Sequence, residues 1–241
     1  MSKLRHLDKN VRLDAAMALG TTADADAVPA LATQLVSEPD FFVRETLVWA
    51  LVRIGAPAVD PMIALLAHPD APIRTQAAHA LSKLGDVRAV PALRDALHDD
   101  TESVVQKAVY ALGVLRQVSV LPALLDLLDR QSTSLRNALH DALLAFGAAS
   151  IPALTSRLAD PKSDTRTRVA VIEILAGIGG DAAVPLLSAS LLDADWQVRF
   201  AAVHALSESR IPDLATRLAP VADDEHPHVR MLATRMLGTR G

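Results

Sequence analysis

The side chains with the widest chemical range in this chain are its eight histidines. Histidine holds zinc or iron in proteins, but a protein metal site needs about three such ligands around one ion. His79 and His204 occupy equivalent positions four repeats apart. Because packed helices lie about 8–10 Å from their neighbours, these two side chains cannot share an ion. His68 and His98 lie in adjacent repeats without a matching pattern of carboxylates, so we expect no metal site.

The other reactive side chains do not form a catalytic pattern. The chain has no cysteine, which excludes thiolate nucleophiles, disulfides and cysteine-bound metals. Residues 177–180, GIGG, end a predicted helix, whereas a phosphate-binding loop joins a strand to a helix. Acid pairs such as Asp99 and Asp100 fall in predicted turns, where helix capping and solvation explain them. We therefore expect neither an enzyme nor a bound cofactor.

These side chains are carried by a repeated helical unit, seen most clearly in residues 70–85, DAPIRTQAAHALSKLG. Asp70 is a good N-cap, Pro72 suits a first helical turn, and Gly85 suits a helix end. The same plan recurs every 30 to 32 residues, and a leucine stands seven residues after each register position. The register positions are Arg12, Arg44, Arg74, Val105, Arg136, Arg168, Arg199 and Arg230.

A second helix follows each of the first seven units and is marked by a proline with apolar residues around it. The prolines are Pro29, Pro61, Pro91, Pro122, Pro152, Pro185 and Pro212. A pattern that recurs at a constant period over the whole chain indicates an array of stacked repeats without an internal boundary. The sequence therefore predicts one all-α domain over residues 1–241, an α-solenoid of about seven two-helix repeats with a half repeat at each end.

The N-cap acid, Val-Arg pair, alanine-rich stripe, glycine and Pro-Ala-Leu of this unit resemble HEAT repeats, and most closely the short HEAT-like class first associated with phycobilin lyases. The resemblance implies a right-handed superhelix. It also implies a ladder of hydrogen bonds between the Asp and Arg positions of successive repeats, which would pair Arg74 with caps such as Asp70. Val105 would interrupt that ladder, either as a packed core residue or as a flexible point or partner contact.

Related HEAT-like families suggest three activities to compare with the sequence. Deoxyhypusine hydroxylases bind two irons through His-Glu pairs, and this chain has no His-Glu dipeptide. HEAT-like alkylpurine DNA glycosylases grip duplex DNA on a basic face, but this chain has a net charge of −4 and acidic residues on the predicted face, so we expect no duplex nucleic acid partner. A phycobilin-lyase-like role in handling a chromophore remains an alternative, because repeat similarity alone does not exclude it.

Two kinds of surface are candidates for binding a partner. The second helices of HEAT-like arrays line the concave side, where we expect an apolar pair and two acids. The first helices carry aromatic residues near the two ends of the chain, and such clusters mark interfaces. The partner-binding candidates are Met62, Leu65, Asp95 and Asp126 on the second helices, and Phe41, Trp49, Trp196 and Phe200 on the first helices.

These observations together favour a non-enzymatic scaffold or adaptor that binds another protein. The exposed aromatic residues near the two ends of the chain could also bind a second copy of the same chain, so self-association is an alternative. The charged N-terminus lacks the apolar core of a signal peptide, and no run approaches the ~18 apolar residues that span a membrane, so we expect a cytoplasmic protein without a membrane partner. The sequence leaves open the identity of the partner, the binding face, the oligomeric state and whether the chain is part of a longer protein.

Overall fold

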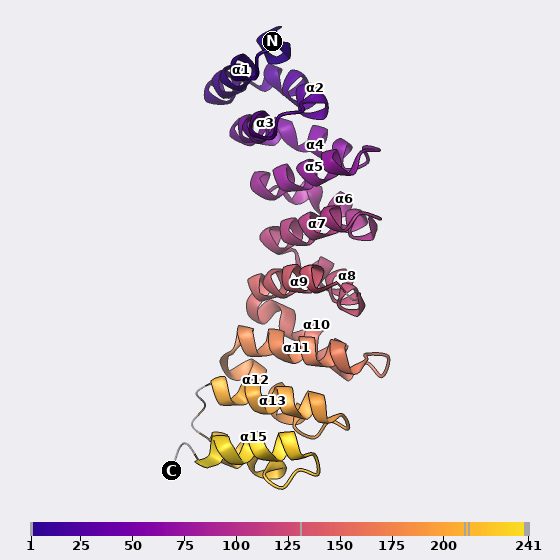
Figure 1. Cartoon of the computed structure of the whole chain (residues 1–241), viewed down its shortest axis with the longest axis vertical. Helices are drawn as coiled ribbons and strands as arrows, with labels where there is room; N and C mark the ends of the chain where they lie inside the picture. Colours follow the sequence, from indigo (N-terminus) through magenta and orange to yellow (C-terminus); the bar gives the residue numbers. More distant parts are fainter. Residues whose placement is uncertain (1, 131, 210, 212, 239–241) are drawn as a thin grey trace. The chain divides into compact units, whose positions relative to one another are not determined.

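The computed structural model of this chain describes residues 2–130, 132–209, 211 and 213–238. Every regular element within these residues is a helix (Figure 1). The chain is an α-solenoid, as the repeat pattern predicts. The chain divides into two compact units, Met1–Val120 and Leu121–Gly241. The prediction of one continuous domain over residues 1–241 therefore remains a prediction.

The described part of the first unit contains α-helices and short 3₁₀ turns. The α-helices are α1 (Lys9–Thr22), α2 (Val28–Ser37), α3 (Phe41–Ile54), α4 (Val59–Leu65), α5 (Ala71–Leu84), α6 (Val90–Asp95) and α7 (Glu102–Leu115). The 3₁₀ turns are η1 (Ser2–Arg5), η2 (Ala25–Ala27), η3 (Ala56–Ala58), η4 (Val87–Ala89), η5 (Ala96–His98) and η6 (Val118–Val120). Odd-numbered helices are the first helices of the repeats, and even-numbered helices are the second.

The second unit continues the same alternation. Its helices are α8 (Leu121–Asp126), α9 (Thr133–Phe146), α10 (Ile151–Ala159), α11 (Thr165–Ile178), α12 (Gly180–Ser190), α13 (Trp196–Glu208), α14 (Leu214–Leu218) and α15 (Pro227–Gly238). Its 3₁₀ turns are η7 (Leu127–Asp129), η8 (Gly147–Ser150) and η9 (Ala219–Val221). Pro212, which marks the last predicted second helix, lies outside the described residues.

The first helices begin and end close to where the repeated pattern predicts. Helix α5 starts after Asp70 and ends at Gly85, whose φ of 66° lies in the left-handed region that glycine adopts without strain. Asp40, Asp164 and Asp195 accept hydrogen bonds from backbone N–H groups of the following turn, as N-caps do. Asp70 occupies the predicted N-cap position of α5, but the prediction that its carboxylate accepts the N–H groups of the first turn is wrong, because its side chain accepts no such bond.

The core of each unit consists of leucine, valine and alanine at the predicted register. The leucines seven residues after the register positions of the first helices from α3 to α13, including Leu51, Leu81 and Leu143, are fully buried. Those of the two end helices, Leu19 of α1 and Leu237 of α15, are half-buried. Val105 is also fully buried, which confirms that it packs in the core. Small residues let helices approach closely. A Cβ atom on Gly20 of α1 would lie 2.8 Å from the Ala50 backbone and 2.5 Å from the ring of Trp49.

The ladder arginines do not pair with the N-cap acids as the HEAT resemblance implied. Arg74 instead donates Nε and Nη2 to the carboxylate of Asp99, at 2.6 and 2.8 Å, in the turn before α7. Its Nη1 donates to the backbone carbonyls of His68 and Pro69 before its own helix. Asp99 accepts in turn from the backbone N–H of Thr101. One guanidinium thus ties together the turns at the start of two successive first helices, an arrangement that we call the arginine clamp.

The arginine clamp recurs in both units. The other arginine–acid pairs are Arg12 with Glu38, Arg168 with Asp193, and Arg199 with Asp224. In each case the acid stands two residues before the N-cap position of the next first helix and accepts from the backbone N–H of that position. Arg12, Arg74 and Arg199 each donate two hydrogen bonds to the acid, whereas Arg168 donates one, through Nη2. A two-point pair between planar groups is geometrically specific, so it fixes the orientation of the turn that carries the acid.

The clamp also sets the ionisation of its acids. Hydrogen bonds from Arg74 and Arg199 hold the pKa values of Asp99 and Asp224 below the usual aspartate range. Burial raises the pKa of Glu38, but hydrogen bonds from Arg12 and Gln34 outweigh that effect, and the pKa lies below its usual value. All three carboxylates are therefore ionised at neutral pH, because the contacts of the folded protein favour their charged form.

Some repeats lack the acid of the clamp. Arg44 keeps its bonds to the carbonyls of Glu38 and Pro39. His68 stands in the place of the acid, two residues before Asp70, and its Nδ1 accepts from the backbone N–H of Asp70. For Arg136 the corresponding residue, two positions before Asp164, is Lys162. A different arginine connects the elements in that part of the second unit. Arg157 of α10 pairs with Asp129 of η7, and Asp129 also accepts a hydrogen bond from Thr167 of α11.

One described stretch, Thr133–Ala159, is long and apolar enough to cross a membrane by length and composition alone. The expectation that no run approaches the ~18 apolar residues of a membrane span did not foresee this stretch. The stretch is not one straight helix, because α9 ends at Phe146, Gly147 has a φ of 55°, and α10 begins at Ile151. Each of the two helices is shorter than the ~20 residues that a transmembrane helix needs.

Removing the acid of a clamp should destabilise the protein much more than removing the acid beside it. Asp99→Ala deprives Arg74 of its partner in a mostly buried position, and breaking such a pair costs about 3 kcal/mol. Asp100→Ala removes an exposed acid one residue away and should change stability little. Urea unfolding of both variants measures the difference. Equal losses of stability would show that the clamp is not a stabilising contact.

The clamps should also make the protein sensitive to acid. Because the folded-state pKa values of Asp99 and Asp224 are lowered, their contribution is complete above the unfolded aspartate pKa of about 4 and is lost as the pH falls through the lower folded-state values. We expect the thermal midpoint to fall as the pH is lowered below about 4, and to fall less steeply in Asp99→Ala. A midpoint that rises or stays constant on acidification would contradict this linkage.

Candidate functional site

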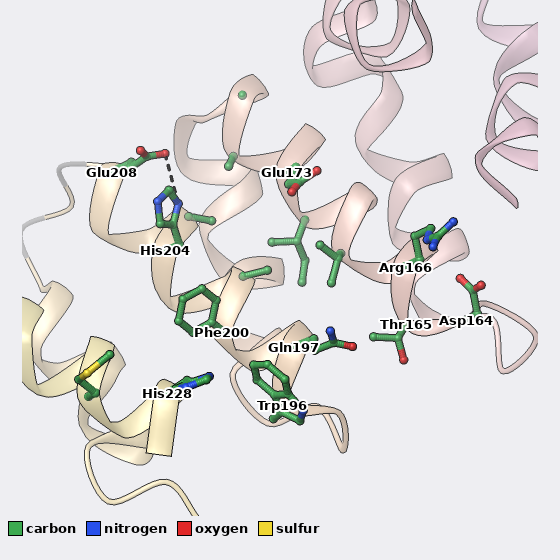
Figure 2. A pocket seen from close by; sticks show the side chains of 17 residues that line it. Asp164, Thr165, Arg166, Glu173, Trp196, Gln197, Phe200, His204, Glu208 and His228 are labelled. Atoms are coloured by element: carbon green, nitrogen blue, oxygen red, sulfur yellow. Dashed lines mark ion pairs between the residues drawn. The ribbon is translucent and has the colours of Figure 1, made fainter. Parts of the chain in front are cut away.

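A groove of about 1330 Å³ lies on the outer face of the first helices α11, α13 and α15 in the second unit. These helices pack side by side in the order α11, α13, α15 (Figure 1). The groove exceeds the roughly 300–1,000 Å³ of small-molecule pockets, which suits a macromolecular segment. Its lining combines apolar residues, including Val169, Phe200 and Met231, with a few charged ones (Figure 2).

The starts of α11 and α13 are fixed by polar contacts. Asp164 caps α11 through the backbone N–H of Thr167, and Asp195 caps α13 through that of Gln197. Thr165, in the first turn of α11, donates its hydroxyl to Asp195 at 2.6 Å and so links the two helix starts. The arginine clamps of Arg168 and Arg199 hold the turns that precede α13 and α15. The face that carries the groove therefore has a defined geometry.

An aromatic cluster lies at the N-terminal end of the groove. Trp196 stacks on His226, with ring centroids 3.9 Å apart and an angle of 7° between the rings. His228 meets the same indole edge-on at 5.7 Å and lines the groove (Figure 2). Phe200 lies one helical turn further along α13 and is half-buried. Trp196 is thus held in place by α15 while it borders the groove.

The charges in the groove are distributed unevenly along the helices. Asp164 and Arg166 lie together at the start of α11. The backbone and side chain of Thr167 lower the pKa of Asp164, with a smaller contribution from Arg166. Glu173 and Glu208 lie towards the C-terminal ends of α11 and α13 (Figure 2). The C-terminal end of the groove is therefore acidic.

Of the first-helix candidates, the structure brings Trp196 and Phe200 together in the groove. The other two lie in the first unit. Phe41 is 55% exposed at the start of α3, in edge-to-face contact with Phe42. Trp49 is 39% exposed, but its ring lies against Gly20 of α1. Neither of them lines the groove described here.

The second-helix candidates do not form a common site. The prediction that Met62 is a surface residue is wrong, because its side chain is fully buried. Pro61 lies one position later relative to Val59 than Pro29 lies relative to Val28, so Met62 takes the core position of the first repeat's Leu31. Leu65 is half-buried, and the exposed Asp95 and Asp126 lie in different units. Partner binding by Leu65, Asp95 and Asp126 remains a prediction.

Three residues that line the groove were not among the partner-binding candidates predicted from the sequence. Met231 and Glu173 occupy the same outward register as Phe200 and His204, and comparing that register across consecutive repeats could have identified them. His228 flanks a proline at a helix start, where capping is the simpler interpretation. Its contact with Trp196 depends on tertiary packing and has no local sequence signal.

The histidines and acids of the described residues form a few close pairs. No three histidine or acid side chains among them converge on a point where a metal ion could bind. His204 Nδ1 lies 3.7 Å from Glu208, and both side chains are mostly exposed. In the first unit, burial lowers the pKa of His79, whose Nε2 lies 3.6 Å from Glu45.

Comparisons with known proteins agree with this architecture. The family model described as HEAT repeats matches residues 1–62, 33–113 and 151–238, which together make up most of the chain. No curated protein sequence matches. An archaeal HEAT-like repeat protein from Thermococcus onnurineus NA1 superimposes with a TM-score of 0.52 and 15% identity, covering 86% of this chain and 94% of that one.

Two further solved structures resemble the chain less well in shape. Human deoxyhypusine hydroxylase, solved in complex with glycerol, gives a TM-score of 0.44 at 20% identity, with 91% of this chain and 98% of that chain covered. The CpcE–CpcF complex of phycocyanin lyase from Nostoc sp. PCC7120 gives 0.41 at 22% identity, with 99% and 92% covered. These values carry no functional argument. The family match does carry one conclusion: the chain belongs to the HEAT-repeat family.

Proposed function

We propose that this protein is a non-enzymatic scaffold or adaptor, and that the groove on α11, α13 and α15 is the surface that binds another protein. The observation that carries the proposal is that successive first helices present Phe200 and Met231 to one groove beside Trp196. Met231 is 65% exposed. Aromatic and methionine side chains surrounded by polar groups are characteristic of protein-binding surfaces.

The rigidity of the groove supports the same proposal. Its helices are tied at their starts by Thr165 and by the clamps of Arg168 and Arg199. A surface that is formed before binding loses little conformational entropy when a partner arrives. The charges of Asp164, Glu173 and Glu208 outnumber that of Arg166, which disfavours a phosphate backbone as the partner.

Disrupting the groove should abolish capture of a partner protein. In Trp196→Ser/Phe200→Asp, two apolar contacts are lost and a charge is introduced, and changes of this kind at interface centres cost 2 kcal/mol or more, about 30-fold in affinity. Affinity capture from the native host, followed by mass spectrometry, compares this variant with the wild type. Tyr110→Ser/Val114→Asp, at exposed positions four residues apart on α7 of the first unit, is the matched control.

We expect the wild type and the control to retain the same specific partner and the groove variant to lose it. Because Trp196 also stacks on His226, circular dichroism must show that the variant is folded. Met231→Asp, at an exposed position, tests the same groove with less risk to the fold. If folded groove variants keep every specific partner, the groove is not the binding surface. If the wild type self-associates in sedimentation and the groove variants do not, the occupant is a second copy of this chain.

A further inference from the structure

The apolar and acidic residues of the groove follow a regular spacing along two parallel helices. On α11, Glu173 lies four residues after Val169. On α13, Glu208 lies eight residues after Phe200. At 1.5 Å per residue these separations correspond to about 6 and 12 Å along the helix axes. An apolar side chain bound near Val169 and Phe200 would thus place its own neighbours, one or two helical turns further on, beside the two acids.

The two acids are available to a ligand. Among the described residues, Glu173 forms no ion pair or hydrogen bond that would neutralise it. Glu208 has only the long contact to the exposed His204, drawn in Figure 2. Glu208 is also the last residue of α13, where unpaired backbone carbonyls add a partial negative charge. This end of the groove therefore attracts cations.

The opposite end of the groove does not repel a cationic ligand strongly. Arg166 is the single Lys or Arg side chain in the lining, and it lies two residues from the ionised Asp164. The two charges offset each other at the start of α11. Trp196 and His228 border the groove at this end, and Phe200 lies one helical turn towards the acidic end, where they can contact apolar and cationic groups alike (Figure 2).

We infer that the groove binds an amphipathic helix of a partner protein, in which an apolar side chain is followed by lysine or arginine four or seven to eight residues later. The spacing of Val169, Phe200, Glu173 and Glu208 matches side chains on one face of such a helix. This inference rests on the proposed function, because it names the chemistry of the partner for the same groove.

Synthetic peptides provide the test. The first probe is a fluorescein-labelled 15-residue helix with leucine at helical spacing and lysine elsewhere, and the second carries glutamate in place of every lysine. Fluorescence anisotropy measures their affinity for the full chain. We expect the lysine peptide to bind at least tenfold more tightly than the glutamate peptide, with an affinity that falls as salt increases.

Matched charge variants locate the binding site. Glu173→Gln/Glu208→Gln should weaken the lysine peptide by roughly three- to tenfold, in line with two partly exposed ion pairs. Asp14→Asn/Asp26→Asn removes the same net charge from exposed positions of the first unit and should leave the affinity unchanged. Equal weakening by both variants would show that only the net charge of the protein matters and would overturn the inference.

The remaining outcomes separate this inference from the proposed function. If the lysine peptide does not bind, or the glutamate peptide binds as tightly, the stated partner chemistry is wrong. Loss of captured protein in the Phe200 and Met231 variants would then still support a protein-binding groove for a partner of other chemistry. If those variants also keep their partner, both proposals fail together.

Discussion

The structure depends on a single polar contact that recurs at the turns between repeats. In each complete clamp a guanidinium binds an acid in the next turn and backbone carbonyls in its own, as Arg199 does with Asp224 and with the carbonyls of Asp193 and Ala194. A turn that connects packed helices leaves backbone groups without helical partners, and buried polar groups must be paired. The clamp satisfies these groups and, by its two-point geometry, sets the direction in which the next first helix begins.

The groove is a consequence of this repetition. A repeat buries its apolar face against its neighbours, so the outward residues of the first helices are free to vary without loss of the fold. In the second unit three consecutive outward faces carry Val169, Phe200 and Met231, and the clamps keep their helices in register. The same scaffold would position polar residues equally well. The apolar character of this face is therefore a property of the sequence that the fold itself does not require.

Periodicity was sufficient to predict the helices, their order and most core positions, because a leucine seven residues after the register position is buried in every first helix from α3 to α13. It failed where the pattern shifted by one residue, as with Met62, since one residue turns a side chain by 100° around a helix. It also missed the acid that binds Arg74, because Asp99 is distant in sequence and the nearer Asp70 suits the same role chemically. For the groove, Trp196 and Phe200 were visible as a helical pair, whereas the contribution of His228 depends on how α15 packs against α13.

The chain contains two tryptophans, Trp49 against Gly20 in the first unit and Trp196 beside the groove, and this allows a direct test of where a helical segment binds. In Trp49→Phe, intrinsic fluorescence reports on Trp196 alone, and in Trp196→Phe it reports on Trp49 alone. Titration with the leucine–lysine peptide, which contains no tryptophan, should shift the Trp196 emission to shorter wavelengths as water is excluded, and should leave the Trp49 emission unchanged. A response from Trp49 with none from Trp196 would contradict binding in the groove.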